Sequence, residues 1–446
     1  ALAGDLVFDL LAARLVIRLR GSGRGYRWLV VAGAIPCAMA FAALYAMPAW
    51  GARSGWMLAF ALLVFRGAYA VIDVPHNALM AQMTTDSRAR GRVSGYRLLF
   101  STASSLAVAT VLAPLVQDAA RDRAFGALAI TGLVAAVLFT LTMVLCALTS
   151  RGGTDRPPTA GDAQDGIAVP LGNSLVLGMG LLAIVTGFAI PMFGRMILYV
   201  STYVVDRPDL VGTLLLALTA GQFVGVLAWT ALTSRHDKSR LLAMGHAVSG
   251  VGMALFVLCL GWPPALPACA ALIGFGFASV FMLPWGLLAD TVDFVAWRHG
   301  RRLETGLFAA YLVAVKASGA ASTALIGWSL GWLGYVPGAG QTFAVQAGMV
   351  ALGLGVPFAG CLGATLLMRR FDIGHRRHAR VLAALSRRNT RARRPDQSGA
   401  EPVSGLNLGL AKSSGEGTTF AGGAALSAQA RQSMSRSIAA PALVRS

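Results

Sequence analysis

The sequence predicts an all-α protein that crosses a membrane many times. Hydrophobic residues make up 56% of the 446 residues and charged residues only 13%, whereas a soluble domain carries about 25% charged residues. Apolar runs of about 20 residues, the length that crosses the hydrocarbon core as a helix, recur along most of the chain. Glycine, which lets helices approach closely in lipid, is frequent within these runs.

Each apolar run is bounded by a polar or charged loop, which predicts about eleven spanning helices. Four prolines lie inside these runs. Membrane helices tolerate proline because neighbouring helices can satisfy the freed carbonyl groups. The expected spans are 1–19, 26–48, 55–82, 93–116, 123–149, 173–204, 209–233, 239–261, 265–296, 303–333 and 342–369.

The loops between the spans alternate in charge. Positively charged loops remain in the cytoplasm, so we expect the C-terminus to be cytoplasmic and the protein to lie in the inner membrane of the cell. The net charge of +19 sits in these loops and in the tail, and it therefore does not indicate a nucleic-acid partner. The basic set comprises residues 18–27, 88–92, 151–156, 235–240, 298–302 and the tail.

A polar loop at 150–172 divides five expected spans from six. An odd number of spans with a cytoplasmic C-terminus would leave the N-terminus outside, so we expect a further first helix that completes two bundles of six. The alternative is a genuine eleven-span protein. We divide the chain into an N-terminal bundle at 1–149, the loop at 150–172, a C-terminal bundle at 173–370 and a basic, largely disordered cytoplasmic tail at 371–446.

Among the charged residues within the expected spans, five are candidates for a common function. A charge at the middle of a membrane helix costs about 2.5 to 3.5 kcal/mol on insertion scales, so such residues usually have a function. Asp5 and Asp9 are four residues apart and share one helix face, and two adjacent carboxylates favour uptake of a proton or of a cation between them. The other three are Asp73, Arg97 and Lys316. Salt bridges that only fix helix packing are the alternative, and they suit one pair better than five residues spread over four spans.

The ordered motifs of the chain resemble the glycoside–pentoside–hexuronide cation symporters, typified by the melibiose carrier, within the major facilitator superfamily. The motifs are AGDLVFDLL before a basic loop, DVPH at 73–76, TTDSRARGRVSGYR, and LPWGLLADTVDFVAWRHGRRLETGLFAAYLVAVK. The resemblance runs from Asp5 to about Arg370. It implies a two-bundle major-facilitator fold and cation-coupled symport of a sugar, glycoside or related small solute by alternating access, without enzymatic chemistry.

The resemblance also implies roles for single residues. Asp73 would lie where the solute and cation sites meet, and Arg97 would pair with it. Phe8 and Ala70 stand where the family often has neutral oxygen ligands; sodium needs several oxygens, whereas a proton needs only a carboxylate of suitable pKa. We therefore expect a proton, in preference to sodium, as the coupling ion, and no other cofactor or metal. The implied cation site is Asp5, Asp9, Asp73 and Lys316, and the implied solute site is Asp73, Arg97, His76 and Asn77.

A second set of charges lies near the expected cytoplasmic ends of the helices. Salt bridges between its two parts would close an inner gate and break when the gate opens. Topogenic charge alone explains the arginines but not the acids among them. One part is Asp86, Arg88 and Arg92, and the other is Asp290, Asp293, Arg301, Arg302 and Glu304.

The expected partners are a sugar-like small molecule, the coupling cation and the lipid bilayer, and we expect a monomer. Two other functions remain open from the sequence. One is a carrier of the same fold that moves a lysolipid or another amphiphile. The other is a membrane sensor or scaffold that transports nothing, in which neutralising Asp73 or Lys316 would leave function unchanged.

Overall fold

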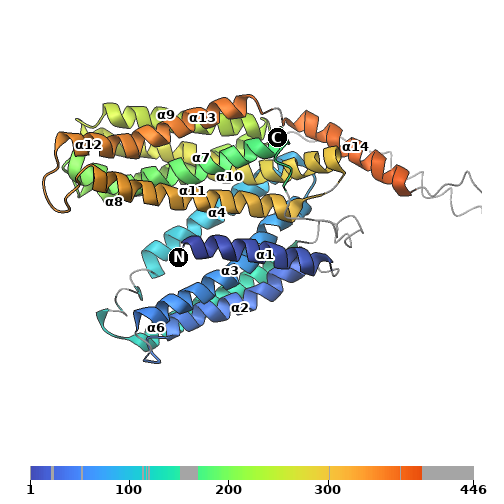
Figure 1. The fold of residues 1–446 in the computed structure, drawn as a ribbon, viewed down its shortest axis with the longest axis horizontal. Coiled ribbons are helices and arrows are strands. Elements are labelled where there is room, and N and C mark those ends of the chain that lie inside the picture. Colours follow the sequence, from blue (N-terminus) through green and yellow to red (C-terminus); the bar gives the residue numbers. More distant parts are fainter. Residues whose placement is uncertain are drawn as a thin grey trace, which may run out of the picture. The chain divides into compact units, whose positions relative to one another are not determined.

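The computed structural model describes residues 2–21, 25–51, 54–112, 115–116, 118, 121–150, 169–300, 302–371 and 373–393. Within these residues all regular structure is helical, and nine helices are long and apolar enough to cross a membrane (Figure 1). The predicted fold class is confirmed. Most of the polar loop at 150–172 and the tail from 394 onward lie outside the described residues.

The N-terminal helices, α1 to α6, correspond to the first five expected spans. A small buried cluster of Val30, Ala34, Cys37 and Ile72 joins α2 to α3. These helices are α1 (Leu2–Gly21), α2 (Tyr26–Ala46), α3 (Gly55–Met83), α4 (Ser87–Ala107, continued by the π-helical turn Val108–Leu112) and α6 (Phe125–Thr149).

The fourth span begins earlier than the sequence predicts, at Ser87 instead of residue 93. The Asp86 side chain accepts hydrogen bonds from the backbone amides of Arg88 and Ala89 and so caps α4. This capping supplies partners for amides that have none inside the helix. Hydropathy misses this extra turn because the residues in it are polar.

The C-terminal helices, α7 to α13, share one large apolar core. Glycines of α8 allow close packing on α10: a Cβ atom on Gly221 or Gly225 would collide with the α10 backbone. These helices are α7 (Ser174–Tyr199, continued by Val200–Val204), α8 (Leu210–Leu232), α9 (Lys238–Leu258), α10 (Leu266–His299), α11 (Glu304–Trp332), α12 (Phe343–Val350) and α13 (Val356–Arg369), the last two joined by Ala351–Gly355.

The N-terminal and C-terminal helices meet along several pairs. Helices α1 and α3 contact α11, and α4 contacts α8 and α10. The sequence assigned residues after 371 to a tail, but the structure forms a further helix there, α14 (His375–Arg393), which contacts α10 and α4 (Figure 1). Every site described below lies at one of these contacts.

Candidate functional site

Three charged side chains meet between α1, α3 and α11. The Lys316 ammonium lies 2.8 Å from Asp9 Oδ2 and 3.1 Å from Asp73 Oδ2. Asp9 is 1% exposed, and Lys316, at 27%, is reached by solvent more easily. Two carboxylates facing one ammonium leave an excess negative charge in apolar surroundings, which favours binding of a proton or cation. We refer to Asp9, Asp73 and Lys316 as the charge cluster; the side chain of Asp5 lies outside the described residues.

Two apolar residues lie at positions next to the charge cluster, Phe8 on α1 and Ala70 on α3. Phe8 packs on Gly67 of α3, where an added Cβ atom would lie 3.5 Å from its ring. Ala70 is buried. Neither residue offers a side-chain oxygen to an ion. Asn77 donates hydrogen bonds to Asp73 Oδ1, at 2.7 Å, and to the Asp73 carbonyl, at 2.6 Å, so it orients the carboxylate that Lys316 contacts.

Two polar atoms on α3 next to the charge cluster are unpartnered among the described residues. They are His76 Nδ1 and Asn77 Oδ1, and both are buried. A buried polar atom without a hydrogen bond costs about 1 to 3 kcal/mol. Such atoms are therefore available to a ligand. The role of His76 and Asn77 in a solute site stays a prediction, and neither residue lines the cavity described below.

The predicted pairing of Arg97 with Asp73 is not formed. Lys316 contacts Asp73 instead, while the Arg97 guanidinium lies over the Trp285 ring, 4.8 Å from its centroid. A planar guanidinium stacks well on an aromatic face. Trp285 is not among the predicted site residues, although its position in the LPWGLLAD motif, five residues before Asp290, could have indicated it.

Arg97 and Trp285 line a cavity of about 410 Å³ between α4, α8 and α10. Serine side chains of α4 and Gln222 of α8 supply hydrogen-bonding groups, and the lining contains no acidic residue. Trp285 also packs against a buried cluster that includes Ala13, Val74 and Leu312, which are near neighbours in sequence of the three members of the charge cluster. Trp285 therefore connects the cavity to the charge cluster.

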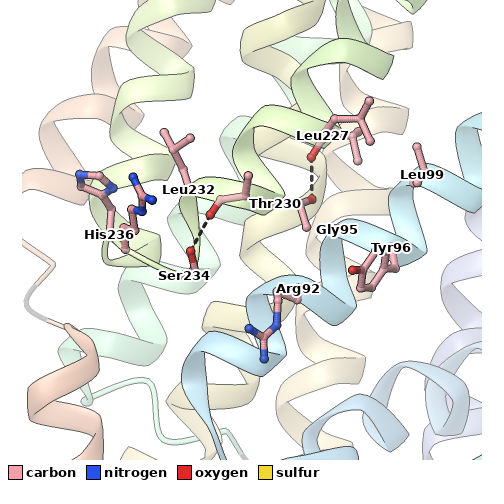
Figure 2. A pocket seen from close by; sticks show the side chains of 12 residues that line it. Arg92, Gly95, Tyr96, Leu99, Leu227, Thr230, Leu232, Ser234 and His236 are labelled. Carbon is pink, nitrogen blue, oxygen red and sulfur yellow. Dashed lines mark hydrogen bonds between the residues drawn. The ribbon is translucent and has the colours of Figure 1, made fainter. Parts of the chain in front are cut away.

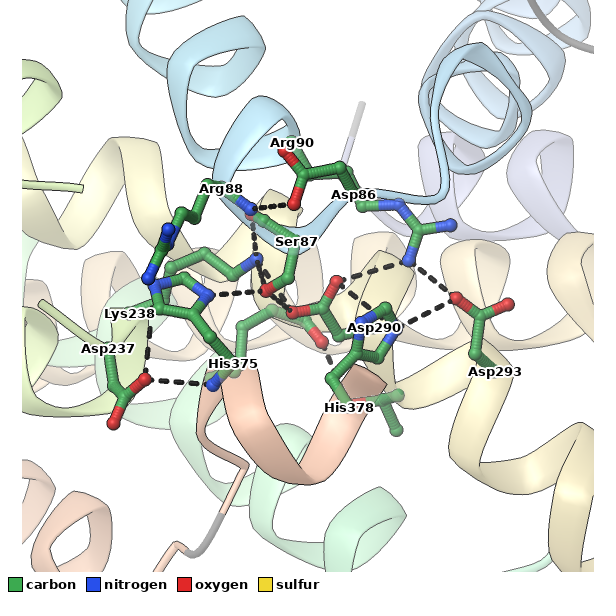
Figure 3. Close-up of polar contacts among 12 residues, drawn as sticks. Asp86, Ser87, Arg88, Arg90, Asp237, Lys238, Asp290, Asp293, His375 and His378 are labelled. Carbon is green, nitrogen blue, oxygen red and sulfur yellow. Dashed lines mark hydrogen bonds and ion pairs between the residues drawn. The ribbon is translucent and has the colours of Figure 1, made fainter. Parts of the chain in front are cut away.

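A second group of ion pairs joins α4 to α10 (Figure 3). Arg90 Nη1 lies 2.7 Å from Asp293 Oδ2 and 3.1 Å from Asp290 Oδ1. Lys238 Nζ lies 2.6 Å from Asp290 Oδ2. All four side chains are buried. Arg90 belongs to the N-terminal helices, whereas the other three residues belong to the C-terminal helices. These contacts therefore hold the two groups of helices together at this end. We refer to these four residues as the end network.

Further contacts extend the end network towards α11. Arg302 Nη2 lies 3.2 Å from Asp293 and 2.7 Å from Glu304. Gln82 of α3 donates a hydrogen bond of 2.9 Å to Glu304. The structure thus brings together Asp290, Asp293, Arg302 and Glu304, as predicted, whereas Arg301 lies outside the described residues.

Arg90 is the residue of α4 that contacts the aspartates of α10. The residues predicted for the gate in this segment, Asp86, Arg88 and Arg92, form no such ion pair within the described part of the chain. Asp86 caps α4, and Arg88 and Arg92 are exposed. Successive residues of a helix point about 100° apart, so the face that carries Arg90 differs from the face that carries Arg88. Residues Ser87, Arg90, Gly91 and Ser94 form the buried stripe of α4, and this helical spacing could have indicated Arg90.

Two histidines of α14 add to the end network (Figure 3). His378 Nε2 lies 3.0 Å from Asp293 Oδ2. His375 Nδ1 lies 3.1 Å from the Ser87 hydroxyl, and the His375 amide donates to Asp237 at 2.8 Å. Helix α14 therefore contacts both groups of helices. The two histidines are not among the predicted site residues, because the surrounding segment contains no apolar run long enough to suggest a span.

Solved structures place this arrangement among the major facilitator transporters. The chain superposes on the transporter FucP in the outward conformation with a TM-score of 0.58 at 12% identity, covering 81% of this chain and 87% of the other. It superposes on the proton:xylose symporter XylE with a TM-score of 0.58 at 13% identity, covering 83% and 85%. The likeness shows a major-facilitator fold.

Residues 1–375 match the family model described as MFS/sugar transport protein, and the chain belongs to that family. It is 25% identical to the inner membrane symporter YicJ of Escherichia coli over 75% of this chain and 73% of the relative. It is 23% identical to the glucuronide carrier protein homolog of the same organism over 77% and 76%.

Proposed function

We propose that this protein is a secondary active transporter that couples a cation to symport of a sugar, glycoside or related small solute by alternating access. The observation that carries the proposal is the charge cluster, in which Lys316 is shared by Asp9 and Asp73. Binding of one cation would neutralise the excess negative charge. A neutral site is enclosed in low-dielectric surroundings at a lower cost in free energy than a charged one, so the carrier can change conformation more easily once the cation is bound.

The solute would bind in the cavity beside Trp285. Its serine, threonine and amide groups can exchange hydrogen bonds with hydroxyl groups, and the Trp285 ring offers an apolar face. This lining suits a sugar better than a lysolipid, whose acyl chain would require a mostly apolar wall. Among the described residues that line the cavity, Arg97 is the charged one. Its positive charge would attract a carboxylate, so the substrates tested should include acidic sugars.

A proton is the coupling ion that the charge cluster supports best. The carboxylates of Asp9 and Asp73 and the amide oxygen of Asn77 are the side-chain oxygens described above, while Phe8 and Ala70 contribute none. Sodium would have to complete its coordination with backbone or water oxygens. A proton needs a single carboxylate whose pKa has been adjusted by its surroundings.

Alternating access also requires a gate, and we propose the end network for this role. The positive-inside rule places the loops around Arg90 and Arg302 in the cytoplasm, together with the C-terminus. The buried pairs between Arg90 and the two aspartates would then close the cytoplasmic side in the state that the structure represents. They would break when the solute is released inwards.

Uptake into proteoliposomes tests the proposal. Radiolabelled neutral glycosides and hexuronides are offered under an inward proton gradient or an inward sodium gradient. We expect uphill uptake of at least one sugar that follows the proton gradient, is abolished by an uncoupler and ignores sodium. Uptake that requires sodium and persists without a pH gradient would contradict proton coupling, and uptake of lysolipid but of no sugar would contradict the proposed substrate class.

A further inference from the structure

A groove of about 830 Å³ lies between α4 and α8, lined by residues distinct from the charge cluster (Figure 2). Arg92, Tyr96 and Leu99 of α4 form one wall. Leu227 of α8 and Arg235, in the turn that follows α8, belong to the other. The two helices touch at Gly95, where an added Cβ atom would collide with the Thr230 side chain. The groove therefore runs along a contact between the N-terminal and C-terminal helices.

Both walls of this groove change from basic to apolar in the same direction. On α4, Leu99 follows Arg92 by seven residues, which is about 10 Å of helical rise. On the opposite wall, Leu227 lies five residues before the end of α8 at Leu232, about 7.5 Å of helical rise, and Arg235 follows in the turn. Since α4 begins and α8 ends at this side of the molecule, both arginines lie at the ends of the helices and both leucines lie deeper in the membrane-spanning part.

The basic end of the groove has an excess of positive charge. Arg92 and Arg235 are exposed, and within the described part of the chain neither forms an ion pair within 4.0 Å. The lining contains no aspartate or glutamate. The acid nearest in sequence, Asp237, accepts a hydrogen bond of 2.8 Å from the His375 amide and lines another cavity. This end of the groove suits an anionic group at the level of the lipid headgroups.

We infer that the groove binds an anionic phospholipid such as phosphatidylglycerol. Its phosphate would lie between Arg92 and Arg235, and an acyl chain would lie along Leu99 and Leu227. Basic pockets between membrane helices on the cytoplasmic side bind such headgroups. Snorkelling of the two arginines to the membrane surface would explain each residue alone, but it would not explain their convergence on one groove with apolar walls. A lipid bound here would bridge α4 and α8.

Native mass spectrometry of the full chain tests this inference. The protein is released from mixed vesicles of phosphatidylglycerol and phosphatidylcholine with matched acyl chains, and retained lipid is counted. We expect selective retention of phosphatidylglycerol. The double variant Arg92→Gln/Arg235→Gln should bind it about thirtyfold more weakly, because each arginine near a membrane surface contributes roughly fivefold.

The matched control is Arg240→Gln/Arg369→Gln, which removes the same charge from the cavity between α9 and α13. It should leave the retained phosphatidylglycerol unchanged, and both double variants should unfold thermally as the unmodified protein does. Equal loss in the two double variants, or no loss in the first, would overturn the inference. Displacement of the lipid by millimolar glycerol phosphate would also overturn it, because the groove would then recognise a soluble phosphate without its acyl chains.

Discussion

At the scale of single residues, Lys316 is the cation that both carboxylates of the charge cluster share. Its ammonium contacts Asp9 and Asp73, which belong to two different helices of the N-terminal part. If the lysine is removed, two carboxylates remain close together in apolar surroundings, and at least one must take up a proton. Lys316 therefore influences both the packing of α11 on α1 and the charge available for coupling.

Lys316→Gln should abolish uphill uptake and destabilise the protein by about 3 to 5 kcal/mol, the usual cost of removing one partner of a buried ion pair. Thermal unfolding in detergent and uptake in proteoliposomes measure the two effects. Adding Asp73→Asn should restore part of the stability, because one of the two carboxylates left without a counter-charge is removed, but should not restore coupled uptake. Arg88→Gln, which removes an exposed charge, is the control. Unchanged uptake by Lys316→Gln would favour a sensor or scaffold.

Trp285 is the second residue on which binding should depend. It lies between the solute cavity and the charge cluster, and its ring also stacks on Phe308. Trp285→Ala should weaken sugar binding about tenfold, since aromatic contacts contribute roughly 0.5 to 1.5 kcal/mol beyond their buried area. Trp285→Phe should retain most of the affinity. Isothermal titration calorimetry measures both, with the exposed Trp297→Ala on the same helix as control; equal effects of Trp285→Ala and Trp297→Ala would exclude the cavity.

At the scale of elements, the sequence predicts spans well because twenty apolar residues in a row have few other stable environments. The predictions fail where polar residues form structure. Hydropathy begins the fourth span at residue 93, although Asp86 caps a helix that begins earlier, at Ser87. It also leaves α14 in a tail. The acids Asp290 and Asp293 could be recognised from their motif. Identifying Arg90 as their partner requires knowing which face of α4 meets α10.

Helix α14 illustrates how two side chains can hold a polar element in place. His378 is buried against Asp293, whereas Arg380, two residues later, is exposed. His378→Ala should increase amide hydrogen exchange across His375–Arg393 several-fold and leave exchange in the spanning helices unchanged. Arg380→Ala should change neither. Equal exchange in the two variants would show that other contacts, such as those of His375, are sufficient to dock α14.

At the scale of the whole molecule, the two groups of ion pairs differ in their exposure to solvent. The charge cluster joins α1 and α3 to α11 through a lysine that solvent reaches in part, whereas the end network joins α4 to α10 through side chains that are almost fully buried. Opening at the end network would therefore expose four charges to water. The favourable hydration of these charges offsets part of the cost of breaking the pairs, so the closed and open states can be close in free energy.

The last prediction concerns which side of the membrane reaches the cavity. In a variant without native cysteines, Thr219→Cys places a thiol in the cavity lining. A membrane-impermeant maleimide should label it in right-side-out vesicles and poorly in inside-out vesicles, because the end network closes the cytoplasmic side. Asp290→Asn/Asp293→Asn should raise inside-out labelling several-fold, since Arg90 and Lys238 then face each other without counter-charges. Asp118→Asn/Asp122→Asn, which removes two exposed acids from a loop predicted to be external, should have no such effect; strong inside-out labelling before any substitution would refute the gate.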